Sequence, residues 1–87
     1  MTRPNILLVV LDAVRADHLS CYGAGRETTP TIDELAANGV RFEHAFSTSN
    51  WTGAAHGSLF TGHLPSQSGI YGNSQTLLKE EPTLTEL

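Results

Sequence analysis

Cysteine and basic side chains are both scarce in this sequence. Cys21 is the single cysteine among 87 residues, which rules out an internal disulfide framework and makes a reducing compartment the simpler setting. Lysine and arginine number five against nine aspartates and glutamates, and the five are scattered, so the basic stripe of nucleic-acid-binding proteins is missing. The net charge of −4 still permits an anionic substrate, because a local site can oppose the global charge.

Long hydrophobic runs are absent as well. The apolar run Ile6–Leu11 is far shorter than the ~20 residues that span a bilayer. It is also short for the core of a signal peptide, and Asp12 follows it directly. These absences predict a cytoplasmic protein with neither a nucleic-acid nor a membrane partner.

The apolar pattern of the first half predicts two strands around a helix. Residues 5–11 are continuously apolar, as in a strand that is covered on both faces of a parallel sheet. Thr29 and Pro30 have the residue types of an N-cap and a first helical position, and this predicts a helix that ends at Asn38-Gly39. Residues 40–46 alternate and predict a half-buried strand with His44 on its apolar face.

The second half predicts one clear helix. It begins near Thr52 and runs roughly to Thr61, with Gly62 suited to the left-handed residue that ends a helix. Residues 63–76 are rich in glycine, serine and asparagine and are expected to be irregular, whereas residues 81–87 have the pattern of a helix start.

Two strands make a poor parallel sheet, because the buried strand needs neighbours on both edges. We therefore expect residues 1–87 to be the N-terminal portion of a larger α/β protein; the alternative is a small domain that dimerises.

Two side chains lie at positions that are typical of active sites, a helix start and the end of a strand. Thr52 places a hydroxyl at a helix start, where unpaired N–H groups and the helix dipole favour an oxyanion. Asp12 follows the predicted strand at residues 5–11, at the sheet edge where ligand sites of α/β folds gather. Together they suggest a metal-and-nucleophile site with Asp12 and Thr52 as metal ligands. The simpler alternatives are that Thr52 is only an N-cap and that Asp12 caps the next turn.

Neighbouring residues complete this hypothesis. His56 lies one helical turn after Thr52 and shares a face with it, so it could contact substrate oxygens or relay protons; it could equally cover an exposed helix surface. Arg15 and Asp17 are expected to pair in the loop. One carboxylate cannot hold a metal alone, so further ligands are expected from residues beyond 87.

Four segments of the chain resemble sulfatases, in the order in which that family has them. They are residues 4–12, 15–23, 28–42 and 52–62, the last followed by Leu64-Pro65. The resemblance implies a doubly wound, alkaline-phosphatase-like parallel-sheet fold and metal-assisted hydrolysis of sulfate or phosphate esters. It also implies a divalent cation (Ca²⁺, Mn²⁺ or Zn²⁺) and a small-molecule or glycan ester as the substrate.

The signature around the nucleophile departs from the usual Cys-x-Pro-Ser-Arg of sulfatases. Thr52 stands at the cysteine position and His56 at the arginine position, with Ala54 and Ala55 between them. Threonine is not converted to formylglycine, so the resemblance is to the threonine-nucleophile branch of the superfamily. It implies Thr52 and His56 as catalytic residues. The alternatives are a phosphodiesterase or phosphotransferase that uses the same residues, and a non-catalytic truncated module.

Overall fold

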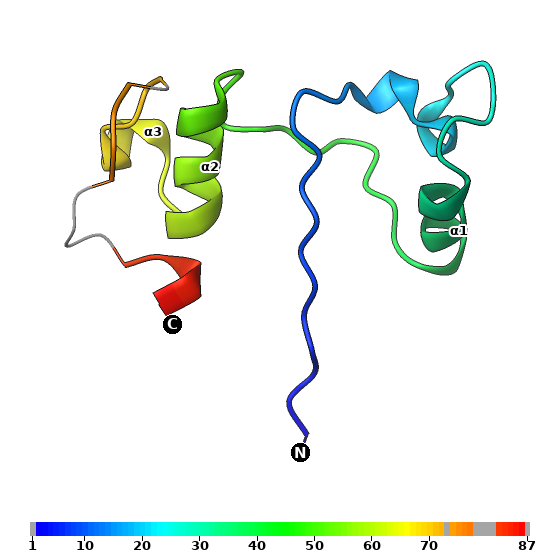
Figure 1. Cartoon of the computed structure of the whole chain (residues 1–87), viewed down its shortest axis with the longest axis horizontal. Helices are drawn as coiled ribbons and strands as arrows, with labels where there is room; N and C mark the ends of the chain where they lie inside the picture. Colours follow the sequence, from blue (N-terminus) through cyan, green and yellow to red (C-terminus); the bar gives the residue numbers. More distant parts are fainter. Residues whose placement is uncertain (1, 73, 78–81, 87) are drawn as a thin grey trace. The chain divides into compact units, whose positions relative to one another are not determined.

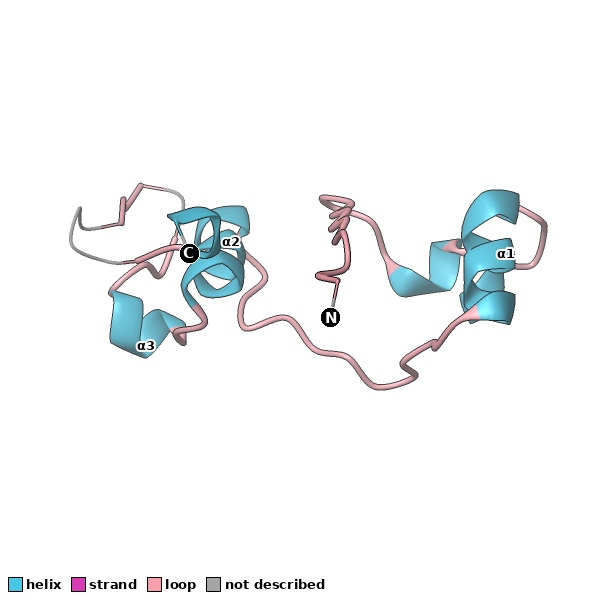
Figure 2. Cartoon of the chain, turned by 90° about the horizontal axis from the view of Figure 1, so that it is seen from below, coloured by secondary structure: helices cyan, strands magenta, loops and turns pink. Residues whose placement is uncertain are grey.

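The computed structural model describes residues 2–72, 74–77 and 82–86 and divides the chain into two compact units, Met1–Glu43 and His44–Leu87. Each unit contains one longer helix with short helices near it (Figure 1). All regular secondary structure in the described residues is helical (Figure 2). Among these residues, no helix is long and apolar enough to cross a membrane.

The first unit has two short 3₁₀ helices and one α-helix. The 3₁₀ helices are η1 (Ala16–His18) and η2 (Ser20–Tyr22), and the left-handed Gly23 at φ 95° ends the second. Helix α1 spans Pro30–Asn38, so the predicted helix is confirmed together with proline at its first position.

Thr29 occupies the predicted N-cap position of α1, but its hydroxyl does not cap the helix. Its Oγ1 instead accepts from the Ser20 N–H at 3.1 Å and donates to Asp33 Oδ1 at 3.2 Å. The Ser20 Oγ in turn accepts from the N–H groups of Thr28 and Thr29, both at 3.1 Å. These bonds hold η2 against the start of α1.

Both predicted strands are wrong for the described residues. Residues 5–11 have no ladder partner, and their side chains are exposed, from 48% at Val10 to 88% at Ile6 and Leu7. Residues 40–46 are also unpaired, and His44 is exposed and does not lie in a core. The physical reason is that a strand is stabilised by hydrogen bonds to neighbours and by covered faces, and the described residues provide neither.

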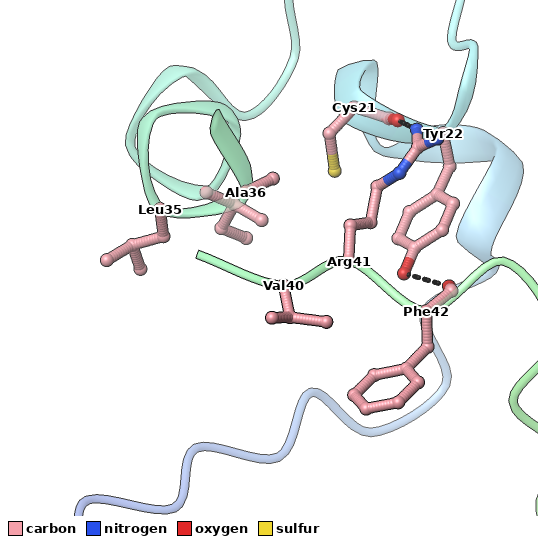
Figure 3. Close-up of a pocket in the computed structure, with 8 residues that line it drawn as sticks. Cys21, Tyr22, Leu35, Ala36, Val40, Arg41 and Phe42 are labelled. Carbon is pink, nitrogen blue, oxygen red and sulfur yellow. Dashed lines mark hydrogen bonds between the residues drawn. The ribbon is translucent and has the colours of Figure 1, made fainter. Parts of the chain in front are cut away.

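Polar contacts tie the segment after α1 back to η2 (Figure 3). The Tyr22 hydroxyl donates to the Phe42 carbonyl at 2.7 Å. The Arg41 guanidinium lies 5.1 Å from the centre of the Tyr22 ring and donates to the Cys21 carbonyl. These residues, with the apolar side of α1, line a pocket of about 240 Å³.

The expected ion pair lies at the start of η1, between its N-cap Arg15 and Asp17 in its first turn. Arg15 Nη2 lies 2.6 Å from Asp17 Oδ2, and this hydrogen bond lowers the pKa of Asp17 below its ordinary value. Both side chains are largely exposed, so the pair contributes little to stability.

The second unit is built on α2, which spans Thr52–Thr61 as predicted. Gly62 at φ 73° ends it in the left-handed conformation, and its N–H donates to the Ser58 carbonyl at 2.8 Å. Helix α3 (Pro65–Ser68) and the 3₁₀ helix η3 (Leu84–Glu86) both contact α2.

One of the predictions for this unit is wrong, and another is matched in the described residues. Residues 63–76 were expected to be irregular, but they contain α3, whose start is held by a hydrogen bond from the Leu64 N–H to Gln67 Oε1 at 2.9 Å. The helix start expected at residues 81–87 corresponds to η3, although residues 81 and 87 themselves lie outside the described residues.

One face of α2 is buried against Ile70. Ala54 is 0% exposed, Ile70 is 4% exposed, and Gly57 and Ser58 share this buried face. A Cβ atom on Gly57 would lie 3.2 Å from Ile70 Cδ1. Glycine at position 57 therefore allows the close approach that fixes the helix in its unit.

Candidate functional site

Thr52 is the first residue of α2. The preceding Trp51 has extended backbone angles, φ −103° and ψ 133°, and occupies the N-cap position. The alternative that Thr52 is the N-cap is therefore wrong, and the threonine belongs to the first helical turn. Its side chain is exposed, so a ligand can reach it at the end of the helix that carries the positive dipole.

The residues after Thr52 are small. Gly53 is half-buried and Ala54 points into the packed face, so no bulky side chain stands beside Thr52 in the first turn. Backbone N–H groups at a helix start bind anions well when a ligand can approach them closely. This turn therefore has the local form of an oxyanion site with a hydroxyl at its edge.

His56 is directed towards the start of the same helix. Its Nδ1 lies 2.9 Å from the Thr52 carbonyl oxygen. A carbonyl can only accept, so Nδ1 is the donor in this hydrogen bond. The structure thus brings Thr52 and His56 together, but through the threonine backbone and not through its hydroxyl.

The His56 ring has a second neighbour, which the sequence analysis missed. The Phe60 ring lies 6.3 Å from it, centre to centre, at an angle of 40°. The spacing of four residues in a predicted helix was the available signal for this pair. Ser58 was also missed: its buried Oγ has no hydrogen-bond partner within the described part of the chain.

Asp12 lies in an exposed turn after the apolar run. The next residue, Ala13, has a left-handed backbone with φ 58°, which is unusual for a residue other than glycine. Asp12 belongs to the Met1–Glu43 unit and Thr52 to the His44–Leu87 unit. Their convergence on one metal ion stays a prediction.

The described residues do not make a complete metal site. Among them, no three or more histidine, cysteine, aspartate or glutamate side chains group as ligands of one ion. Asp12 offers one carboxylate, whereas Zn²⁺ needs four ligands and Ca²⁺ six or more. These side chains supply only a fraction of a coordination shell.

Comparison with known proteins identifies the class. A model of the sulfatase family matches residues 4–87, almost the whole sequence, and the chain belongs to the sulfatase family. The predicted resemblance is therefore confirmed. This family implies an alkaline-phosphatase-like α/β fold and a general dependence on a divalent metal. The described residues contain helices but no paired strands of that fold.

Individual sulfatases are also similar to the chain. An N-acetylgalactosamine-6-O-sulfatase of Bacteroides thetaiotaomicron is 39% identical over 80 residues, which is 87% of this chain and 16% of the relative. A sulfatase of Escherichia coli, YidJ, is 39% identical over 74 residues, 85% of this chain and 15% of the relative. Human arylsulfatase A is 38% identical over 68 residues, 78% of this chain and 13% of the relative.

The chain thus spans only about one sixth of the length of these relatives or less. No solved structure matches it.

Proposed function

We propose that the protein carrying this sequence hydrolyses sulfate esters with Thr52 as its nucleophile. The observation that carries the proposal is the place of Thr52: an exposed hydroxyl in the first turn of α2, followed by small residues, in a chain of the sulfatase family. Residues 1–87 would form the N-terminal portion of the catalytic domain.

The reaction follows from the chemistry of a hydroxyl nucleophile. Thr52 Oγ forms a bond to the sulfur of the ester, the bond from sulfur to the alcohol oxygen breaks, and the threonine proton ends on the departing alcohol. Water then attacks the sulfur, sulfate leaves, and a proton returns to Oγ. The N–H groups at the start of α2 would stabilise the negative charge on the transferred group.

Asp12 is proposed as one ligand of a divalent cation, with Thr52 as a second. Such an ion, when bound, would lower the pKa of a coordinated hydroxyl and neutralise sulfate oxygens. His56 is proposed as a further residue of the same site, on the face of α2 that carries Thr52. The substrate is proposed to be a small-molecule or glycan sulfate, since two of the relatives named above are an N-acetylgalactosamine-6-O-sulfatase and an arylsulfatase.

Threonine at position 52 favours a second candidate function. A threonine cannot become formylglycine, and its ester must be resolved by a second displacement, which suits phosphodiester hydrolysis or phosphoryl transfer equally well. A third candidate, a module that binds an anion without turnover, is supported by the incomplete set of metal ligands in the described residues.

The test compares two substrates on the protein that carries this sequence. Activity towards an aryl sulfate, supplied with Ca²⁺, Mn²⁺ or Zn²⁺ in turn, is expected to exceed activity towards an aryl phosphodiester. The Thr52→Ala variant should lose at least about 10³-fold in kcat, because it lacks the nucleophile. The control is Thr52→Ser, which keeps a hydroxyl and should retain measurable turnover.

Each alternative has its own outcome. Preference for the phosphodiester, abolished by Thr52→Ala, would establish the second candidate. Saturable binding of sulfate without turnover of either ester would establish the non-catalytic module. Full activity of Thr52→Ala would exclude Thr52 as the nucleophile.

A further inference from the structure

We propose that His56 is a positioning residue for Thr52. By donating from Nδ1 to the Thr52 carbonyl, His56 fixes the first turn of α2 and with it the direction of the Thr52 hydroxyl. This inference rests on the proposed function, because it takes Thr52 as the nucleophile. It assigns the histidine a task that needs its Nδ1 hydrogen and no change of its charge.

The first turn of α2 needs such support. Its N-cap residue, Trp51, makes no side-chain capping bond. Gly53 lies in the first turn and Gly57 follows in the second, and glycine has a lower helix propensity than alanine. A helix start of this composition frays unless another contact holds it.

The His56 bond has no explanation in helix termination. Two other side chains donate to the carbonyl four residues earlier: Asn38 Nδ2 to Glu34 at 2.9 Å and Thr61 Oγ1 to Gly57 at 2.7 Å. Only the last four carbonyls of a helix lack an intrahelical donor, so the carbonyls of Glu34, Gly57 and Thr52 all accept from a helical N–H as well. The bond from His56 differs from the other two in its place, because it lies in the first turn of α2 and on the residue proposed as the nucleophile.

The imidazole is a firm support because it is held from two sides. Its Nδ1 is fixed by the Thr52 carbonyl, and its ring lies against Phe60 on the next turn. His56 is half-buried, which further restricts its rotamers. A displacement of about 1 Å at a nucleophile can cost about 100-fold in rate, so this support would be visible in kcat.

Asparagine is a suitable matched replacement for His56. Asn38 shows that an asparagine amide can reach the carbonyl four residues earlier in a helix. In the protein that carries this sequence, with an aryl sulfate as the substrate, His56→Ala should lower kcat about 100-fold and change KM little. His56→Asn restores the donor at the Nδ1 position without an imidazole, and it should recover kcat to within about tenfold of the parent protein.

Hydrogen exchange of the amides at residues 55–57 should be faster in the alanine variant and return to the parent rate in the asparagine variant.

The outcomes separate this inference from the proposed function. Equal loss of kcat in His56→Ala and His56→Asn, with Thr52→Ala inactive, would overturn the positioning role and leave Thr52 as the nucleophile. Unchanged amide exchange in His56→Ala would overturn it as well. An active Thr52→Ala variant would instead remove the proposed function. If His56→Ala fails to fold, His56→Gln takes its place. The glutamine amide corresponds to Nε2, so the asparagine variant should have the higher kcat. A higher kcat for the glutamine variant would overturn the proposal.

Discussion

Helix α2 of the His44–Leu87 unit has a buried face, whereas helix α1 of the Met1–Glu43 unit has none. Ala54, Ser58 and Ile70 are at most 8% exposed, but no described residue of the first unit is buried. The first unit depends on polar bonds around Ser20 and Tyr22. The unit that carries Thr52 therefore has buried side chains, whereas the described residues of the unit that carries Asp12 include none.

Exposed apolar side chains occur in both units. Ile6 and Leu7 are 88% exposed in the first unit, and Phe46 is 90% exposed in the second. Side chains of this kind are normally covered in a stable domain. The units therefore differ in their buried side chains, and substitutions at buried and at exposed positions should have very different effects.

The largest effect is expected for Ile70→Ala in the second unit. The removed side chain packs against Gly57 and is 4% exposed, so the free energy of unfolding should fall by about 2 kcal/mol or more. Urea unfolding, followed by the fluorescence of the single tryptophan, Trp51, measures this loss. The matched control is Leu7→Ala, which should change the same quantity by less than about 0.5 kcal/mol. Comparable losses in both variants would show that the two units do not differ in packing.

A smaller effect is expected from Tyr22→Phe in the first unit. This change removes the hydrogen bond to the Phe42 carbonyl and should cost about 1 kcal/mol. Hydrogen exchange of the amides in residues 19–24 gives the local free energy of opening. The control is Tyr71→Phe in the second unit, where the ring is 60% exposed, and no change is expected there. Equal protection in parent and Tyr22→Phe would contradict a unit held by polar contacts.

Acid should weaken the first unit through Asp33. Hydrogen bonding from the Ser20 hydroxyl, with a further bond from Thr29, lowers the pKa of Asp33 below its ordinary value of 3.8, although partial loss of hydration opposes this. A folded pKa below the unfolded one means that the stabilisation is complete above about pH 4 and is lost as the pH falls through the folded value. Carbon NMR titration of the Asp33 carboxyl measures the shift. Ser20→Ala should move this pKa back towards 3.8, and an unchanged pKa in that variant would rule out the serine as its cause.

The smallest effect is expected at Ala13. Its left-handed backbone costs about 1–2 kcal/mol, which glycine would relieve, but glycine also adds about 1 kcal/mol of conformational entropy to the unfolded chain. Ala13→Gly should therefore change the urea midpoint little. Ala13→Val should lower it, because a branched side chain tolerates this conformation poorly. A valine variant as stable as the glycine variant would mean that residue 13 does not keep this conformation.

The helices were predictable because their signals are local. Pro30, Gly62 and the small residues after Thr52 place α1 and α2 without any tertiary information. The contact of His56 with the Thr52 carbonyl agrees with the predicted shared face, although the bonding atom could not be known from the spacing. The match to the sulfatase family confirms the resemblance that the four segments carry.

The rest depends on contacts distant in sequence. Residues 5–11 have the pattern of a buried strand, but a pattern cannot form a ladder without partner strands. Ile70 could not be predicted as the core residue opposite Gly57, because the turn after α3 determines where it lies. The metal ligands beyond Asp12 and the cytoplasmic location also stay predictions, since no described residue bears on them.

Gly57 affects when helix α2 can form during protein synthesis. A helix with two glycines is weak in isolation, and α2 gains its stability when Ile70 closes over it. A nascent chain that ends before residue 70 should therefore carry an unformed α2. The hydroxyl of Thr52 then reaches its place at the helix start only after the ribosome has added the isoleucine, so its reactivity would develop after translation of this segment and not during it.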